Sequence, residues 1–392
     1  MKTVFHKVAL SISLLLHGPG LAAKPLAPNF DPGQQVKYAD GFAYTFIGNS
    51  NVLFTANGEG VLIDGWFSRF SQHTLMFRKI APDPVSVDTA LAKLNIRRNL
   101  GDGSPLGDGA IRLRAVIPGH SHYDHALDAG EVAKRTGAVL LGSKSTGKIG
   151  AAAGLSPCKD LDTGKGCRAE AEVDYVYGFG PFEVILRPSR HLVHRFIGAP
   201  LVNWKIIPRG EMPMEFSPPA KATDYLEGGV SGSRTNPGSY AIVVRHKASG
   251  AIAHVHTSTN AVEGAIKGEC ADIVFLSVAG LRHLKSSMID GLLDETIVKP
   301  GARIVVPVHW DSLTDPLGKV AKDPTGIFRY VVGGSRWDQA KPLRRLDKRP
   351  HAPRIAMPEL WRTYAIAADD PPAALREPCS TPLSGWRTLR LP

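Results

Sequence analysis

Short apolar runs separated by Gly, Asn and Pro make up most of the chain. Three of them, FAYTFI, NVLFTA and GVLIDG, follow one another within residues 42–65 and predict a meander of strands. Apolar residues at helical spacing predict helices over 69–80 and 86–96. Further strands are expected at 111–118, 138–143, 182–188, 239–246, 251–256, 272–278 and 302–309. The segment EVAKRTG between the first two of these is expected to be a helix, and this strand–helix–strand order predicts a layered α/β domain.

The N-terminus has the order of a secretory signal peptide. Lys2 and Lys7 give a positive start, the apolar run VALSISLLL follows, and HGPG precedes Leu21-Ala22-Ala23, after which cleavage is expected. The apolar run is about half of the ~20 residues that a membrane span needs, and no later segment is long and apolar enough to be one. We therefore expect residues 1–23 to be removed and the mature protein to be periplasmic or secreted. The alternative is an uncleaved N-terminal anchor.

The rest of the chain predicts one folded domain with an extension. Hydrophobic residues make up 43% and charged residues 21%, which excludes disorder of the whole chain. Residues 24–320 carry the periodic pattern, whereas 321–392 are basic and Pro-rich, so we expect a C-terminal extension packed on the same domain. The long Pro/Gly-rich stretch 200–238 is typical of a functional loop, either a lid or a groove for a lipid-like substrate.

Four cysteines and a net charge of +11 add two expectations. Cys158 and Cys167 lie nine residues apart in a loop-like stretch, which favours a local disulfide in an oxidising compartment. Cys270 and Cys379 would then form the second pair. The Lys and Arg residues are scattered and no nucleic-acid motif accompanies them, so we expect no nucleic-acid partner and interpret the charge as promoting solubility.

The motif HSHYDH carries the chemistry. It places His120, His122, Asp124 and His125 within six residues, directly after a predicted buried strand and before a helix. Neutral imidazole and carboxylate are ligands of zinc, and a loop lets neighbouring side chains reach different sides of a metal pair. The alternative, a solvated polar turn, is disfavoured because only 14 histidines occur in the chain. The motif therefore predicts a site for two divalent metal ions, with zinc the first choice.

Two more histidines stand at strand ends downstream. His191 follows the strand 182–188, and His309 ends the strand 302–309 and is followed by Trp310 and Asp311. Each emerges from an apolar run, as a ligand at a sheet edge would. His194 lies three residues beyond His191 and competes with it for the same role. We expect His191 and His309 to complete the metal site.

HSHYDH resembles the HxHxDH signature of the metallo-β-lactamase-fold hydrolases, and GNSNVLF…GVLIDGWF resembles their first strand pair. The likeness covers roughly residues 40–315, and in motif style it is nearest to the branch that holds ascorbate-phosphate lactonases and the N-acyl-phosphatidylethanolamine phospholipase D. It implies a four-layer αββα sandwich with the metals in a cleft between the sheets. The implied first-metal ligands are His120, His122 and His191, and the second-metal ligands are Asp124, His125 and His309. Asp64 would be a buried acid that orients the motif.

The chain departs from the family pattern at one ligand. A bridging Asp is expected after the strand 251–256, but Thr257 and Ser258 stand there instead. The second metal site is therefore expected to be weak, and activity with a single metal is an open alternative. His254 and His256 alternate along the same strand, and His256 is either a substitute ligand or a histidine that contacts the ligands.

The predicted function is that of an exported metal-dependent hydrolase that uses a metal-bound hydroxide on an ester, lactone or amide, β-lactams included. Asp124 and His125 are the catalytic candidates, and Asp124 would hydrogen-bond the nucleophile. Ser121 is rejected as a nucleophile because no G-x-S-x-G elbow is present. The alternatives are a phosphodiesterase of the phospholipase-D type and a non-catalytic metal-binding protein of the same fold.

Substrate contacts are expected beside the metals, and the substrate is a small or lipid-like molecule. Arg187, Arg190, His194 and Arg195 flank His191 and either bind a phosphate or carboxylate or are solvated loop cations. Residues that contact the ligands or the substrate, rather than the metals, are expected at Asp64, Ser258, His256, His194, Arg190 and Asp311.

Overall fold

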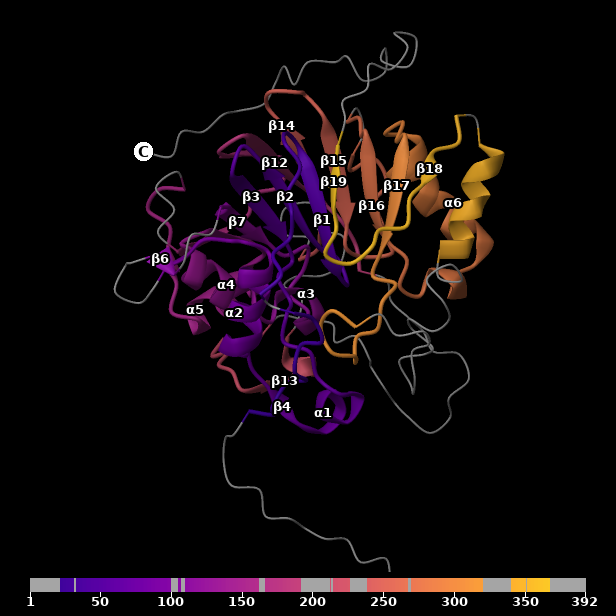
Figure 1. The fold of residues 1–392 in the computed structure, drawn as a ribbon. Coiled ribbons are helices and arrows are strands. Elements are labelled where there is room, and N and C mark those ends of the chain that lie inside the picture. Colours follow the sequence, from indigo (N-terminus) through magenta and orange to yellow (C-terminus); the bar gives the residue numbers. More distant parts are fainter. Residues whose placement is uncertain are drawn as a thin grey trace, which may run out of the picture.

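Two β-sheets face each other and helices cover both outer faces in this computed structural model (Figure 1). The ranges that the structure describes are 22–31, 33–99, 105–106, 110–161, 166–191, 212, 214–225, 238–266, 269–319, 340–349 and 351–366. The signal-peptide prediction and most of the stretch 200–238 fall outside these ranges. In the described part of the chain, no helix has the length and apolar character that crossing a membrane requires.

The first sheet contains eight strands among the described residues, in the order β19-β1-β2-β3-β7-β8-β10-β9. Its strands are β1 (Ala43–Gly48), β2 (Asn51–Ala56), β3 (Glu59–Ile63), β7 (Arg112–Ile117), β8 (Val139–Gly142), β9 (Ser156–Pro157), β10 (Cys167–Glu170) and β19 (Thr363–Ala365). The predicted meander is antiparallel, whereas β3, β7, β8 and β10 run parallel. In this parallel half the C-terminal ends of the strands lie at one end of the sandwich, and the motif begins there, after β7.

The second sheet contains seven strands among the described residues, in the order β11-β12-β14-β15-β16-β17-β18. Its strands are β11 (Val176–Phe179), β12 (Phe182–Pro188), β14 (Tyr240–His246), β15 (Ile252–His256), β16 (Ile273–Ser277), β17 (Ile304–Val308) and β18 (Arg354–Ile355). Strands β15 to β18 run parallel to one another. As a result the C-terminal ends of β15 and β17 lie at the same end of this sheet, and β17 leads directly to His309.

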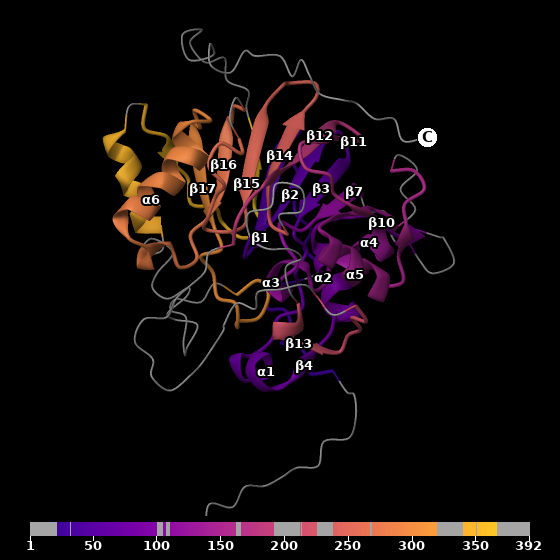
Figure 2. The same ribbon diagram turned by 180° about the vertical axis from the view of Figure 1, so that it is seen from behind.

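Helices flank the two sheets on opposite sides. They are α1 (Gln72–Phe77), α2 (Pro84–Lys93), α3 (Tyr123–Ala126), α4 (Ala129–Thr136), α5 (Lys144–Ala152) and α6 (Ser286–Leu293). Both views place α2, α4 and α5 beside the first sheet and α6 beside β16 and β17 of the second (Figures 1 and 2). Short two-stranded pairs join β4 (Lys79–Ile80) to β13 (Ala220–Lys221) and β5 (Arg98–Asn99) to β6 (Pro105–Leu106).

Two apolar layers hold the sandwich together. Between the sheets, Phe54 packs edge-on against Phe275 with ring centroids 5.4 Å apart, and the same core includes Val184 and Val255. Outside the first sheet, a second core joins its strands to α2 and α4. Strand side chains alternate between faces, so these strands bury apolar residues on both sides. The predicted four-layer αββα sandwich is confirmed.

The helix predicted over 69–80 is shorter in the structure, where α1 spans only Gln72–Phe77. The apolar residues before it are buried in a coil that Asp128 holds, because its carboxylate accepts the backbone N–H groups of Phe67 and Ser68, each at 2.7 Å. The buried coil before α1 is as rich in apolar residues as a helix would be. The pattern of apolar residues alone therefore predicts a helix that is too long.

The structure describes part of the segment beyond residue 320 and three of the four cysteines. β18 pairs with β17 and β19 pairs with β1, so the segment beyond 320 adds an edge strand to each sheet. The predicted Cys158–Cys167 disulfide is confirmed. Cys270 is also disulfide-bonded, and its expected partner Cys379 lies outside the described residues.

Candidate metal centre

The histidine motif is a buried loop between β7 and α3. Gly119 precedes it, and a Cβ at this position would lie 2.1 Å from Oγ1 of Thr257, so the close approach of the two sheets requires glycine. The backbone then pairs across the sheets, with the N–H of Tyr240 donating to the carbonyl of Gly119 at 2.8 Å. His122 caps the N-terminus of α3, which carries Asp124 and His125 in its first turn. The loop is therefore fixed from the facing sheet.

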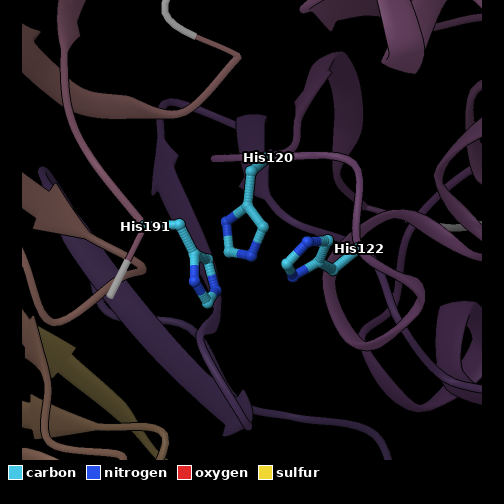
Figure 3. Close-up of side chains that lie close together, drawn as sticks. All are labelled: His120, His122 and His191. Carbon is cyan, nitrogen blue, oxygen red and sulfur yellow. The ribbon is translucent and has the colours of Figure 1, made fainter. Parts of the chain in front are cut away.

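The first set of side chains, called the three-histidine group, comprises His120, His122 and His191. One ring nitrogen from each lies within 4.8 Å of the others. His191 follows β12 of the second sheet, and its ring centroid lies 4.8 Å from that of His120 and 4.6 Å from that of His122. Figure 3 shows the three rings turned toward a common point between the two sheets.

The second set, called the aspartate group, comprises Asp124, His125 and His309. Oδ2 of Asp124 lies 3.4 Å from Nε2 of His125 and 3.3 Å from Nε2 of His309. His309 leaves β17 in a left-handed backbone conformation, with φ of 59°. Without that turn, the side chain would continue the alternation of the strand instead of reaching the carboxylate. The ring of His125 lies 3.9 Å from that of His120, so the two groups are adjacent.

Asp64 supports both the loop and the aspartate group. It is fully buried, and its Oδ1 accepts the backbone N–H of Gly119 at 2.9 Å. Its Oδ2 accepts from Nδ1 of His125 at 2.8 Å and from the hydroxyl of Ser50 at 2.6 Å. A carboxylate on Nδ1 fixes the ring orientation and directs Nε2 toward Asp124. Asp64 thus has the contacts that the family resemblance implies for an orienting acid.

Asn49, which sequence reasoning did not identify, joins the two halves of the aspartate group. Its carbonyl accepts the backbone N–H of His309 at 2.6 Å, and its side-chain amide donates to the carbonyl of Asp124. Its own N–H donates to Oδ1 of Asp311 at 2.6 Å. The buried guanidinium of Arg69 lies 3.6 Å from the other oxygen of Asp311. Asp311 therefore supports the aspartate group through its hydrogen bond with Asn49.

Burial sets the charge of the site. It is the main reason that the pKa of His122 falls to about 4, and burial together with the neighbouring histidines lowers the pKa of His120 well below 6.5. For Asp124, burial acts to raise the pKa, but His125 and His309 outweigh it and hold this pKa below its ordinary value. At neutral pH His120 and His122 are therefore neutral imidazoles and Asp124 is a carboxylate.

This donor set fits two divalent cations. Metal binding requires neutral imidazole and ionised carboxylate. The surroundings favour these states for His120, His122 and Asp124. Each group gathers three ligand atoms within 4.8 Å, and imidazole nitrogen with carboxylate oxygen is the donor chemistry of zinc and of non-haem iron. The three-histidine group would hold one ion, and the aspartate group would hold the other.

The residues after β15 do not supply a further ligand among the described side chains. Thr257 lies beside the three-histidine group, with its Oγ1 3.4 Å from Nδ1 of His120. Ser258, the position expected to replace the bridging Asp, instead donates to the carbonyl of Arg190 at 3.1 Å. The side chain of Arg190 is exposed, and His194 lies outside the described residues.

His256 is placed away from both groups. Strand neighbours Ala253 and Val255 belong to the core between the sheets, so His254 and His256 point to the outer face of the second sheet. Burial lowers the pKa of His256 to about 4. The possibility that His256 replaces a ligand is therefore wrong for this structure, because the side chain is on the opposite face of its strand.

Arg187 lies on the same outer face and is already engaged by acids. Its guanidinium contacts Asp174 at 2.5 Å and forms a buried ion pair with Glu269. These carboxylates neutralise it, so the interpretation of Arg187 as an anion-binding residue beside the metals is also wrong. The sequence places Arg187 near the end of a strand but does not show on which face of the sheet its side chain lies.

Comparisons with known proteins found similar solved structures at low sequence identity. No protein-family model and no curated protein matches it. It is similar to the metallo-beta-lactamase fold protein YhfI from Bacillus subtilis, with 13% identity and a TM-score of 0.44 over 83% of this chain and 99% of that one. A possible metal-dependent hydrolase from Veillonella parvula has 14% identity and a TM-score of 0.43, again over 83% and 99%. CmlA, a diiron beta-hydroxylase from Streptomyces venezuelae, has 12% identity and a TM-score of 0.44 over 84% of this chain and 55% of CmlA.

Proposed function

We propose that the chain is a metal-dependent hydrolase of the metallo-β-lactamase superfamily. The observation that carries this proposal is the adjacency of the three-histidine group and the aspartate group, each with three converging ligand atoms. A buried carboxylate, Asp64, orients the motif between them. Two cations held side by side would activate water and polarise a substrate oxygen, which is the chemistry of two-metal hydrolases.

The side chains of the chain itself prepare the site. Asp124 stays ionised, because His125 and His309 lower its pKa, so it can accept a hydrogen bond from a nucleophile beside it. His125 is held in one orientation by Asp64 and cannot rotate away from Asp124 without losing a buried hydrogen bond. The buried Ser121 is not needed for this chemistry, and its Oγ has no hydrogen-bond partner among the described residues.

We propose an ester, lactone or amide as the bond that is cleaved. Two described arginines are engaged by acids, since Arg187 pairs with Asp174 and Glu269, and Arg69 faces Asp311. These two side chains would not add to the metal ions in binding a charged phosphoryl group, which favours a neutral acyl centre. The Cys158–Cys167 disulfide supports export, because such bonds persist in oxidising compartments.

Metal analysis combined with a substrate panel tests this proposal. The full-length mature protein is purified, its metal content is measured, and turnover of aryl esters, a homoserine lactone, nitrocefin and bis-p-nitrophenyl phosphate is compared. We expect bound metal and hydrolysis of a carboxylic substrate. His122→Ala and Asp124→Ala should lower both metal content and turnover, whereas Ser121→Ala should change neither.

The outcomes separate the alternatives. Faster turnover of the phosphodiester than of every carboxylic substrate would reassign the protein as a phosphodiesterase. Bound metal without hydrolysis of any substrate would favour a binding protein of the same fold. Loss of activity in Ser121→Ala with metal retained would replace the water mechanism by a covalent one.

A further inference from the structure

A pocket lined by arginines lies at the end of the sandwich away from the metal groups. Its volume is about 250 Å³, and its wall includes Arg97, Arg112 and Arg114 together with Gly178 and Gly180. We call it the arginine pocket. It opens between the start of β7 in the first sheet and the β11–β12 turn of the second.

The pocket and the metal groups occupy opposite ends of β7. Arg112 begins this strand, and the metal motif follows its last residue, Ile117. Because a strand rises roughly 3.3 Å per residue, the two ends of β7 lie about 16 Å apart. A ligand bound at the arginines therefore does not reach the ions proposed for the metal groups.

The backbone places the first two arginines next to each other. The N–H of Arg97 donates to the carbonyl of Ile111 at 2.8 Å, and the N–H of Arg112 donates to the carbonyl of Gly58 at 2.9 Å. Ile111 thus links the segment that carries Arg97 to the strand that carries Arg112. Arg114 follows on the same strand, where its Nε donates to Glu59 at 2.9 Å.

One arginine of the pocket is balanced by an acid: Glu59 pairs with Arg114, and its carboxylate lies beside Gly180. No acidic residue lines the wall among the residues that the structure describes. Arg112 is exposed and has no ion-pair partner in the part of the chain that the structure describes. Another cation, Lys247, stands at the rim and donates to the carbonyl of Gly180 at 2.7 Å. Three arginines in the wall of one small cavity favour an anion, since a guanidinium offers a planar pair of donors.

We propose that the arginine pocket binds a small dianion of the phosphate class, either free phosphate or the phosphate group of a small monoester. The volume lies below the ~300–1,000 Å³ of pockets that hold drug-sized ligands, so the ligand is small. Phe179 and Leu161 add apolar wall for a short carbon group. A tetrahedral dianion can accept from several arginines at once, which a carboxylate monoanion cannot do to the same extent.

Calorimetric titration of the full chain tests this assignment. Inorganic phosphate, phenyl phosphate and acetate are titrated at physiological salt, before and after metal is removed with a chelator. We expect saturable binding of one or both phosphates, with little binding of acetate, in either metal state. Arg112→Gln should weaken this binding about tenfold or more, because it removes a charge-assisted contact. Arg362→Gln is the matched control, since Arg362 is an exposed arginine paired with Glu359.

Each result bears on the proposal. Tighter binding of phenyl phosphate identifies a monoester as the ligand, and equal or tighter binding of inorganic phosphate identifies free phosphate. Equal weakening in Arg112→Gln and Arg362→Gln would overturn the assignment, because it would show only attraction to a basic protein. Binding that disappears when metal is removed, but is unchanged in Arg112→Gln, would place the anion at the metal groups and also overturn it.

Discussion

Replacing Asn49 with glycine should weaken metal binding at the aspartate group and spare the three-histidine group. Asn49 has a φ of 54°, which glycine adopts without strain, so the substitution preserves the backbone. The backbone bonds from Asn49 to His309 and Asp311 can therefore remain. Only the side-chain amide that holds the carbonyl of Asp124 is removed.

The magnitude follows from that single contact. Leaving a buried carbonyl without its donor costs about 1–3 kcal/mol. Outer contacts of metal ligands typically change affinity by about 10–100-fold when they are lost. We therefore expect the dissociation constant of the ion bound by Asp124, His125 and His309 to rise by about one order of magnitude or more. The affinity of the three-histidine group should change by less than about threefold, since Asn49 contacts none of its members.

Competitive titration of the metal-free protein with a zinc chelator measures both constants. Asn57→Gly is the matched control, because Asn57 also has a positive φ, 51°, but lies exposed in the turn between β2 and β3. An equal loss at both groups, or the same effect from Asn57→Gly, would refute the reasoning. An unchanged dissociation constant for the aspartate group in Asn49→Gly would also refute it, because it would mean that the Asp124 carbonyl needs no donor.

Three further predictions concern the supports and the buried histidines. Asp64→Asn should lower metal affinity about 10–100-fold in a chelator titration without unfolding the protein, because asparagine tolerates the φ of 64° but loses the carboxylate. Gly119→Ala should reduce the free energy of unfolding in urea by about 1–3 kcal/mol or more, since its Cβ meets Thr257 at 2.1 Å. Burial lowers the pKa of His256 from 6.5 to about 4, so the unfolded state binds the extra proton first and stability falls as pH drops through this window. Urea unfolding between pH 7 and 4 should show a smaller decline in His256→Gln, but not in His73→Gln, which alters an exposed ring.

The layers of the fold could be predicted from the sequence because local patterns decide them. The apolar runs at 111–118 and 302–309 correspond to β7 (Arg112–Ile117) and β17 (Ile304–Val308). The start of α2 was expected at 86 but lies at Pro84, where Asp83 caps the helix and accepts the N–H of Ser86 at 2.8 Å. Caps and buried coils depend on side-chain hydrogen bonds, which periodicity does not represent, so element ends are the part that the pattern misses.

The candidate ligands could also be predicted, but the side chains that support them could not. Histidines after apolar runs indicate a sheet edge, and this signal located His191 and His309. The face of the sheet on which a side chain lies is harder to predict. In HVH at 254–256, apolar residues lie on both sides, so the pattern does not show which face the histidines occupy. His256 was therefore considered as a ligand. Asn49 had a weaker signal, namely the polar run GNSN within an otherwise apolar pair of strands. Its function depends on contacts to residues far along the chain, which only the folded structure supplies.

Hydrogen bonds within the protein hold the backbone of the site in left-handed conformations. Asn49, Asp64 and His309 all have positive φ values, 54°, 64° and 59°, and all three contact the aspartate group or belong to it. Such conformations cost on the order of 1 kcal/mol each and persist only where surrounding structure determines them. Here the determinants are hydrogen bonds within the protein, from Ser50 to Asp64 and from Asn49 to Asp311. These bonds within the protein offset the strain and hold the ligand side chains toward one another.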